Sequence, residues 1–155
     1  MEKDNEITWE DFKKIGIPII VIAICLIFAI FFVYTFFMHG NIKVMDGKDI
    51  VPITSNNGYW TIYFYNNGLA SSKHVILNVS FASPVIINKN GLYVNRQPDV
   101  YIVKENSIFA MWNKLDRYDN IYFYVPVTST ENLYYYKTPI SVTVWADGEL
   151  VYIYP

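Results

Sequence analysis

The side chains that could catalyse a reaction or hold a metal ion are few and far apart in this sequence. The only cysteine is Cys25, and the two histidines are His39 and His74. A metal site needs three or four such ligands close together, and a disulfide needs two cysteines. The carboxylates of residues 116–119 and 147–149 fall in polar turn sequences, and no nucleophile or phosphate-binding motif is present. We therefore predict no metal, no cofactor and no enzymatic activity.

Tyrosine is the abundant residue that could recognise a ligand. The chain has 14 tyrosines, and only Tyr34 lies in the apolar N-terminal stretch. A phenol ring combines apolar area with a hydroxyl, which makes tyrosine common in contact surfaces. Alternation along the later predicted strands turns five aromatic side chains outward: Tyr122, Tyr124, Trp145, Tyr152 and Tyr154. We predict that these five cover one outer face and bind a partner. Tyrosines that only pack across neighbouring strands would give the same pattern.

One tripeptide could carry a covalent glycan. Asn78-Val79-Ser80 is the only N-glycosylation sequon in the chain. The alternation of residues 75–81 buries Val75, Leu77, Val79 and Phe81, which turns Asn78 outward. The sequence therefore predicts an exposed acceptor, provided that this part of the chain lies outside the cytoplasm.

A long apolar segment determines where these side chains lie in the cell. Residues 17–38 carry no charge, and a helix of that length spans about 33 Å at about 1.5 Å per residue. The segment is longer than the apolar part of a cleaved secretory signal and follows an acidic start. We predict a transmembrane helix that acts as an uncleaved signal anchor.

The residues before this helix predict its orientation and its contact with lipid. Residues 1–16 form a short cytoplasmic or interfacial segment in our interpretation. Lys13 and Lys14 directly precede the helix, which favours a cytoplasmic N-terminus by the positive-inside rule. Trp9 and Phe12, with these two lysines, are expected to anchor the segment among the lipid headgroups. The protein would be a single-pass protein of the cell membrane with its C-terminal domain outside.

The charge balance of the remaining chain excludes one class of partner. Beyond residue 16 the sequence holds nine acidic and nine basic residues, without a run of lysine or arginine. Nucleic-acid binding requires a basic patch that replaces counterions. We therefore expect membrane lipid, other membrane or cell-envelope proteins, and copies of this chain as partners, and no nucleic acid.

Alternating patterns after the apolar segment predict an all-β domain. We assign residues 39–48 to a linker and residues 49–155 to an Ig-like two-sheet β-sandwich. Trp60, Ile62 and Phe64 alternate with tyrosines along one strand. We expect one hairpin over residues 85–95 and a closing hairpin over residues 139–155, which turns at Asp147-Gly148.

Two stretches resemble a known kind of surface module. WTIYFYNNGLASSKHVILNVSF and the later MWNKLDRYDNIYFYVPV with TPISVTVWADGELVYIY are similar to strands of archaeal and bacterial Ig-like modules of the CARDB and DUF11 kind. The resemblance covers about 95 residues through pattern and turn chemistry. It implies an Ig-like fold and an interaction role.

The leading hypothesis is a membrane-anchored sandwich that binds another protein, as an accessory or structural subunit of a membrane complex or cell-surface structure. Two alternatives stay open. Gly16 after Lys13-Lys14 resembles the processing site of archaeal pilins, and the archaellum stator proteins also join one helix to a β-sandwich. An anchored domain without copper ligands also resembles a copper-free, cupredoxin-like subunit II of a quinol-type terminal oxidase.

Overall fold

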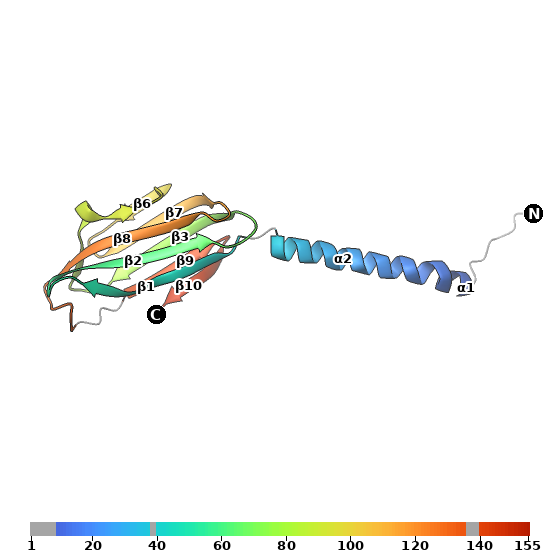
Figure 1. Cartoon of the computed structure of the whole chain (residues 1–155), viewed down its shortest axis with the longest axis horizontal. Helices are drawn as coiled ribbons and strands as arrows, with labels where there is room; N and C mark the ends of the chain where they lie inside the picture. The colour runs from blue at the N-terminus through green and yellow to red at the C-terminus, as the bar shows by residue number, and fades with distance from the viewer. Residues whose placement is uncertain (1–8, 38–39, 136–139) are drawn as a thin grey trace, which may run out of the picture. The chain divides into compact units, whose positions relative to one another are not determined.

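The computed structural model describes residues 9–37, 40–135 and 140–155. The chain divides into an N-terminal unit of residues 1–38 and a C-terminal unit of residues 39–155. Each unit is described by itself below, with the element labels of Figure 1.

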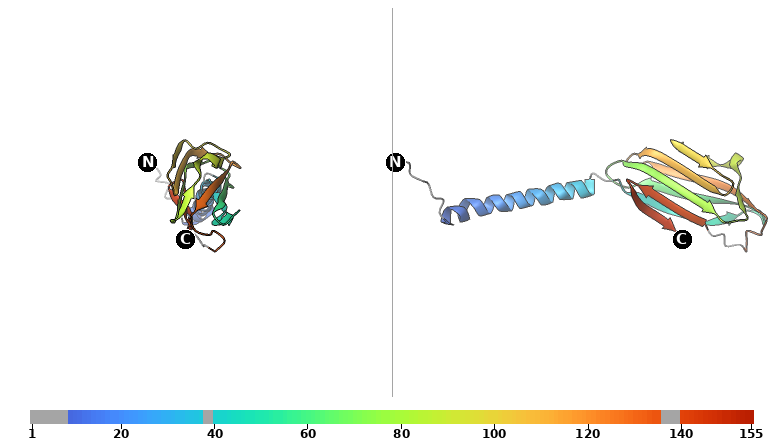
Figure 2. Two further views of the ribbon diagram at one scale, coloured as in Figure 1. Left: turned by 90° about the vertical axis from the view of Figure 1, so that its left-hand side faces the viewer. Right: turned by 180° about the vertical axis from the view of Figure 1, so that it is seen from behind.

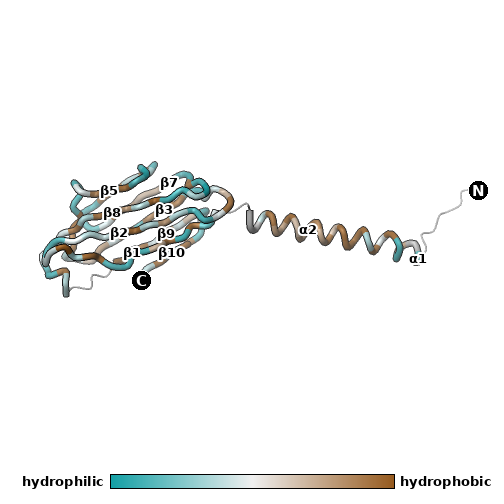
Figure 3. Tube along the Cα trace, viewed as in Figure 1, coloured by the Kyte–Doolittle hydropathy of each residue, from teal (hydrophilic) through white to brown (hydrophobic). Residues whose placement is uncertain are grey.

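The N-terminal unit is helical. It comprises α1 (Trp9–Asp11), the π-helical turn η1 (Phe12–Gly16) and α2 (Ile17–Phe37). The irregular turn lies just before Pro18, whose ring lacks the N–H that the Lys14 carbonyl would otherwise accept. The stretch Phe12–Tyr34 is long and apolar enough to cross a membrane, and Figure 3 shows α2 as apolar along its length. The predicted apolar helix is confirmed, although Met38 lies outside the described residues.

The C-terminal unit is a sandwich of two antiparallel sheets, as predicted. Sheet A has the order β1 (Ile42–Pro52), β2 (Asn57–Asn66), β8 (Asn120–Ser129) and β4 (Val85–Ile87), and β5 (Tyr93–Val94) also pairs with β8. Sheet B has the order β10 (Glu149–Tyr154), β9 (Ile140–Ala146), β3 (Ser72–Phe81), β7 (Ser107–Leu115) and β6 (Val100–Val103). Figure 1 shows sheet A toward the viewer, and the view from behind in Figure 2 shows sheet B.

Strand β1 begins earlier than the sequence predicted. Residues 42–48, which we assigned to the linker, pair with β2 as part of β1. A bulge interrupts this pairing where Asp46 and Gly47 have φ of 71° and 96°. Because the bulge absorbs the turn-like Asp-Gly sequence, one irregular strand replaces a linker followed by a short strand.

The hairpin predicted over residues 85–95 is wrong, whereas the closing hairpin is confirmed. β4 and β5 both pair with β8, and the 3-10 turn η2 (Lys89–Gly91) separates them. β9 and β10 pair through a turn in which Asp147 and Gly148 have φ of 56° and 83°, the positive values that a tight hairpin turn requires. Residue 139, the predicted start of this hairpin, lies outside the described residues.

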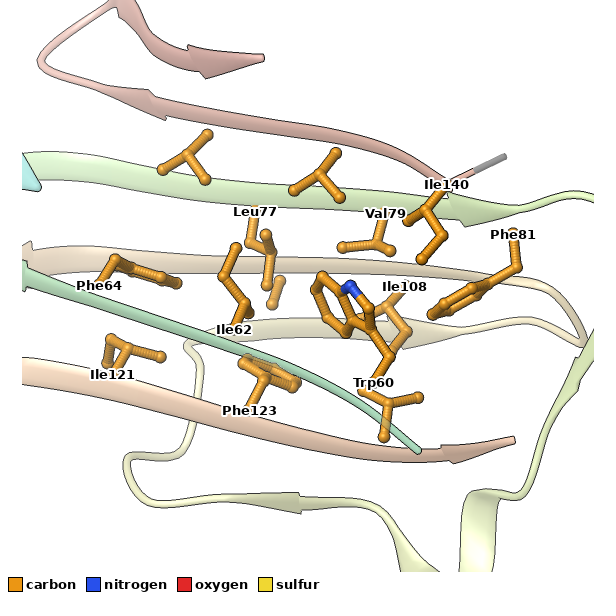
Figure 4. Packing of buried hydrophobic residues seen from close by; sticks show 14 of the residues in the cluster. Trp60, Ile62, Phe64, Leu77, Val79, Phe81, Ile108, Ile121, Phe123 and Ile140 are labelled. Atoms are coloured by element: carbon orange, nitrogen blue, oxygen red, sulfur yellow. The ribbon is translucent and has the colours of Figure 1, made fainter. Parts of the chain in front are cut away.

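The core lies between the two sheets, where many aliphatic side chains pack with a smaller number of aromatic rings. Figure 4 shows Trp60, Ile62 and Phe64 from β2 meeting side chains from β3, β7, β8 and β9. The Trp60 ring meets Phe81 edge-on with centroids 5.7 Å apart, and Trp112 meets Phe64 in the same way at 5.7 Å. The Trp60 indole N–H donates to the Gly47 carbonyl at 2.9 Å. The inward set predicted for β2 and β3 is confirmed.

One polar side chain is fully buried at the end of β2. The Asn66 side-chain oxygen accepts from the backbone N–H groups of Asn41 (3.0 Å) and Gly68 (2.9 Å). Its amide nitrogen donates to the carbonyls of Ala70 (2.7 Å) and Leu115 (3.0 Å). Asn66 therefore joins the start of the domain, the loop after β2 and the end of β7.

Candidate functional site

The outer surface of sheet A carries a cluster of tyrosines, which we call the tyrosine face. Side chains on a strand alternate between the two surfaces of its sheet, and the core takes the other half of β2 and β8. The outward set comes from β2, β8 and β5: Tyr59, Tyr63, Tyr65, Tyr93, Tyr122 and Tyr124.

Strand pairing brings these residues together. Tyr63 lies directly opposite Tyr122, and Tyr124 lies opposite Tyr93. Tyr59 and Tyr124 stack with ring centroids 5.3 Å apart and an interplanar angle of 28°. Tyr122 is 36% exposed and Tyr93 is 55% exposed, and Tyr59, Tyr63, Tyr65 and Tyr124 are half-buried against one another and their neighbours.

A short segment holds Tyr93 on this surface. The Asn95 side-chain oxygen accepts from the backbone N–H of Tyr122 at 2.8 Å, and its amide donates to the Asn120 side chain at 2.9 Å. The Asn95 backbone N–H donates to the Tyr122 carbonyl at 3.2 Å. Asn95 therefore fixes the two-residue strand β5 along β8, which places Tyr93 next to Tyr124.

The tyrosine face is uncharged at its centre and polar at one margin. Neither β2 nor β8 contains a charged residue. Lys43 pairs with Tyr65 along β1, and the Asp46 carboxylate lies 3.4 Å from the Thr61 hydroxyl. In the described part of the sandwich, the phenol hydroxyls with a hydrogen-bond partner are those of Tyr118 and Tyr134, outside this face. The six hydroxyls of the tyrosine face have no hydrogen-bond partner among the described residues.

The single aromatic face predicted from the sequence is wrong in its composition. Tyr122 and Tyr124 lie on sheet A, whereas Trp145 lies on the outer surface of sheet B, 40% exposed. Strands β8 and β9 are not neighbours, because the chain crosses between the sheets after β8. The five predicted residues therefore do not form one surface.

Tyr152 and Tyr154 point the opposite way from the prediction. Both pack against the core, while Val151 and Ile153 are exposed. The cause is a bulge in β10: Leu150 pairs with Trp145 but Tyr152 pairs with Val144, so one extra residue enters the strand. Because side chains alternate with a period of two, one extra residue turns every later side chain to the other surface. Burial raises the pKa of the Tyr152 phenol, with smaller contributions from Tyr154 and Asp46.

The sequence contained part of the signal for the observed face. Alternation had placed Tyr59, Tyr63 and Tyr65 opposite the core side of their strand. Alternation does not identify the partner strand, since pairing between residues 57–66 and 120–129 joins segments more than fifty positions apart. The contribution of Tyr93 depends on the side-chain bonds of Asn95, which no periodicity reveals.

The remaining predicted residues are placed as follows. Asn78 is exposed on the outer surface of sheet B, as expected for an acceptor. Trp9 is 67% exposed and stacks on Phe12 with centroids 5.5 Å apart. The Lys13 ammonium lies 5.7 Å from the Trp9 ring centre, and Lys14 is exposed. Whether these residues meet a glycan or lipid stays a prediction.

The loop carboxylates serve the fold. Asp116 accepts from the Ser71 hydroxyl at 2.6 Å and lies 2.6 Å from the Lys114 ammonium. The bond from Lys114 lowers the pKa of Asp116 most strongly below its ordinary value, and the bond from Ser71 lowers it further. Asp119 pairs with Arg96 and accepts from the Asp116 backbone N–H at 2.9 Å. Within the described residues, no group of three histidine, cysteine or carboxylate side chains could hold a metal ion.

The fold and the site together define a two-sheet β-sandwich with an uncharged tyrosine surface, preceded by one long apolar helix. No family model and no curated protein matches the sequence. The relation to CARDB or DUF11 modules therefore stays a prediction.

Solved structures give matches of low identity. The chitin-binding domain of a hyperthermophilic chitinase from Pyrococcus furiosus is 11% identical, over 72% of this chain and 90% of that one, with a TM-score of 0.42. The collagen-binding domain of a Staphylococcus aureus adhesin is 12% identical, over 72% and 89%, with a TM-score of 0.48. Biomass-sensing modules of Rsgi-like proteins from Clostridium thermocellum match at 12%, over 76% and 99%, with a TM-score of 0.41. At these identities, the sandwich class rests on the strand pairing itself and the chemistry of the site on its own side chains.

Proposed function

We propose that the protein is a single-pass membrane protein whose extracytoplasmic sandwich binds another protein of the membrane or cell envelope. It would act there as an accessory or structural subunit. The observation that carries this proposal is the tyrosine face, because six tyrosines converge on one surface from three strands.

The chemistry of this surface fits recognition of a protein. The centres of protein interfaces are depleted in charge and enriched in tyrosine. Tyrosine gives a large contact area at a low cost in conformational entropy, because only two side-chain torsions must be fixed. The stacked pair of Tyr59 and Tyr124 reduces that cost further, because each ring already restricts the other. The available hydroxyls can bond to a partner's backbone.

The helix supports the placement of this module. Phe12–Tyr34 can span a membrane, and the aromatic and basic residues before it have the composition of an interfacial anchor. The positive-inside rule then directs the sandwich outward. An exposed sequon at Asn78 is compatible with that side of the membrane.

Site-specific photo-cross-linking in native membranes tests the proposal. A photoreactive phenylalanine derivative would replace Tyr63 or Tyr122, which lie opposite each other on the face. The control position is Tyr135, a loop tyrosine that is 87% exposed. We expect one protein adduct of the same mass from both face positions and none from the control. Equal adducts at Tyr135, or no adduct at either face position, would refute protein recognition by this surface.

Substitution separates binding from folding. Tyr63→Ser with Tyr122→Ser removes one cross-strand pair, whose direct interaction contributes roughly 0.2–1 kcal/mol to the stability of the fold. We expect the adduct partner to stop co-purifying while the domain stays folded. Tyr135→Ser should leave co-purification unchanged.

A further inference from the structure

Strand β10 has an open edge that differs from the other edges of the sandwich. It is the terminal strand of sheet B, and β9 pairs with one side of it. Within the residues that the structure describes, no backbone hydrogen bond reaches β10 from its other side. Figures 1 and 2 show it beside the C-terminus at the margin of the sheet. Its unpaired N–H and C=O groups can accept another extended strand.

The other edge strands carry features that discourage such pairing. β1 contains four charged residues, Lys43, Asp46, Lys48 and Asp49. β4 and β5 have three and two residues, and β6 has four. Charge and short length are usual protections of a sheet edge; a bulge is another, and both β1 and β10 contain one. Residues 150–154 of β10, which we call the β10 edge, have no charge, glycine or proline.

Three side chains of the β10 edge are also exposed and apolar. Leu150 is 42% exposed, Val151 is 38% exposed and Ile153 is 61% exposed. They are exposed because the bulge turns Leu150 and Val151 to the same side and sends Tyr152 inward. An added strand would pair the free backbone groups and cover these apolar side chains at once.

We propose that the β10 edge pairs with the β10 edge of a second copy of this chain, so that the two B sheets join across a two-fold axis. Two identical uncharged edges can meet without opposing like charges, and their β-branched and aromatic residues form favourable cross-strand pairs. A partner with charged edge residues would find no complementary charge within residues 150–154.

The small size of the contact means that the two chains must already be close together. Five residues at about 3.3 Å each give an edge about 17 Å long, and a sheet is about 10 Å thick, so each copy contributes about 170 Å². A stable interface between free proteins covers about 800 Å² on each partner. The edge pair is therefore weak and needs a high local concentration. Copies held in one membrane by their own helices have that concentration.

Cysteine cross-linking of the full chain in liposomes tests this pairing. Cys25, the single cysteine, is first replaced by serine. Val151→Cys and Ile153→Cys are then compared with Ile102→Cys on the opposite edge strand β6, where Ile102 is 50% exposed. We expect a disulfide-linked dimer several-fold more abundant at position 151 or 153 than at position 102. Equal yields at the two edges would overturn the proposal.

A second measurement separates edge pairing from association through α2. Chains with different fluorescent proteins at the N-terminus report proximity by energy transfer in the same liposomes. Ile153→Lys places two ammonium groups near the two-fold axis and should reduce the transfer to that of a monomeric membrane protein. The matched variant Ile102→Lys should leave it unchanged. Transfer that survives Ile153→Lys would assign the association to the helix and refute pairing through β10.

Discussion

Replacing Asn66 by alanine gives the sharpest test of how this domain is held together. The Asn66 side chain is fully buried and makes four hydrogen bonds, to the backbone of Asn41, Gly68, Ala70 and Leu115. Alanine removes all four and leaves two N–H groups and two carbonyls without this partner. The affected groups belong to three separate segments, so no single rearrangement can restore them.

The expected loss of stability follows from the number of bonds. Each hydrogen bond contributes about 1 kcal/mol net, and a buried group left without a partner costs about 1–3 kcal/mol. Four bonds give a loss of about 4 kcal/mol, a large share of the roughly 5–15 kcal/mol that stabilises a typical domain. For a domain of this size the melting temperature should fall by about 16 °C, at about 4 °C per kcal/mol.

Thermal unfolding of the full chain in detergent measures this effect. The near-ultraviolet circular dichroism of the buried Trp60 and Trp112 reports on the sandwich. Asn67→Ala is the matched control, because the bond of Asn67 to the Asn41 carbonyl comes from its backbone N–H and its side chain is exposed. The control should change stability by less than about 0.5 kcal/mol. A loss below about 1 kcal/mol for Asn66→Ala would mean that water replaces the bonds and that the reasoning fails.

Three further predictions concern the titration of Asp116, the buried hydroxyl of Tyr152 and the glycosylation of Asn78. The pKa of Asp116 is lowered in the folded protein. Its bonds to Lys114 and Ser71 therefore stabilise the fold at pH values above its ordinary pKa of 3.8, and this contribution is lost as the pH falls through the lowered pKa. Acid unfolding curves of wild type and Asp116→Asn should therefore differ at pH 6 and converge once the pH lies below the lowered pKa of Asp116. Tyr152→Phe should leave the free energy of unfolding equal or up to about 1 kcal/mol higher, because the buried hydroxyl has no hydrogen-bond partner among the described residues; a clear loss in thermal melts would contradict this. Intact mass from a glycosylating host should show a glycan that Asn78→Gln removes, and an unchanged mass would contradict the acceptor assignment.

The sequence predicted those parts of the fold that depend on local periodicity. Trp60, Ile62 and Phe64 alternate with tyrosines in the sequence, and the structure buries all three. The Asp147-Gly148 turn was predictable because few other residues adopt positive φ at two successive positions. The apolar helix followed from a run of residues without charge.

Two features of the site were not predictable from periodicity, for different physical reasons. The bulge in β10 adds one residue at Val151. The sequence of β10 contains no glycine that would indicate a bulge there. One such residue reverses the direction of Tyr152 and Tyr154. The joining of Tyr63 with Tyr122 depends on long-range strand order, which alternation along each strand leaves undetermined.

The two proposed surfaces suit different kinds of partner and can therefore be tested separately. The tyrosine face lies on sheet A and offers rings and hydroxyls, so it suits a partner with its own shaped surface. The β10 edge lies on sheet B and offers backbone groups and aliphatic side chains, so it suits another strand. A dimer joined through β10 would carry two tyrosine faces, one on each sheet A. Such a dimer would bind a partner that is itself present in two copies through both tyrosine faces. The affinity of the dimer for that partner would then exceed the affinity of a single face. If so, Ile153→Lys should weaken co-purification of the cross-linked partner without touching the tyrosine face, whereas Ile102→Lys should not.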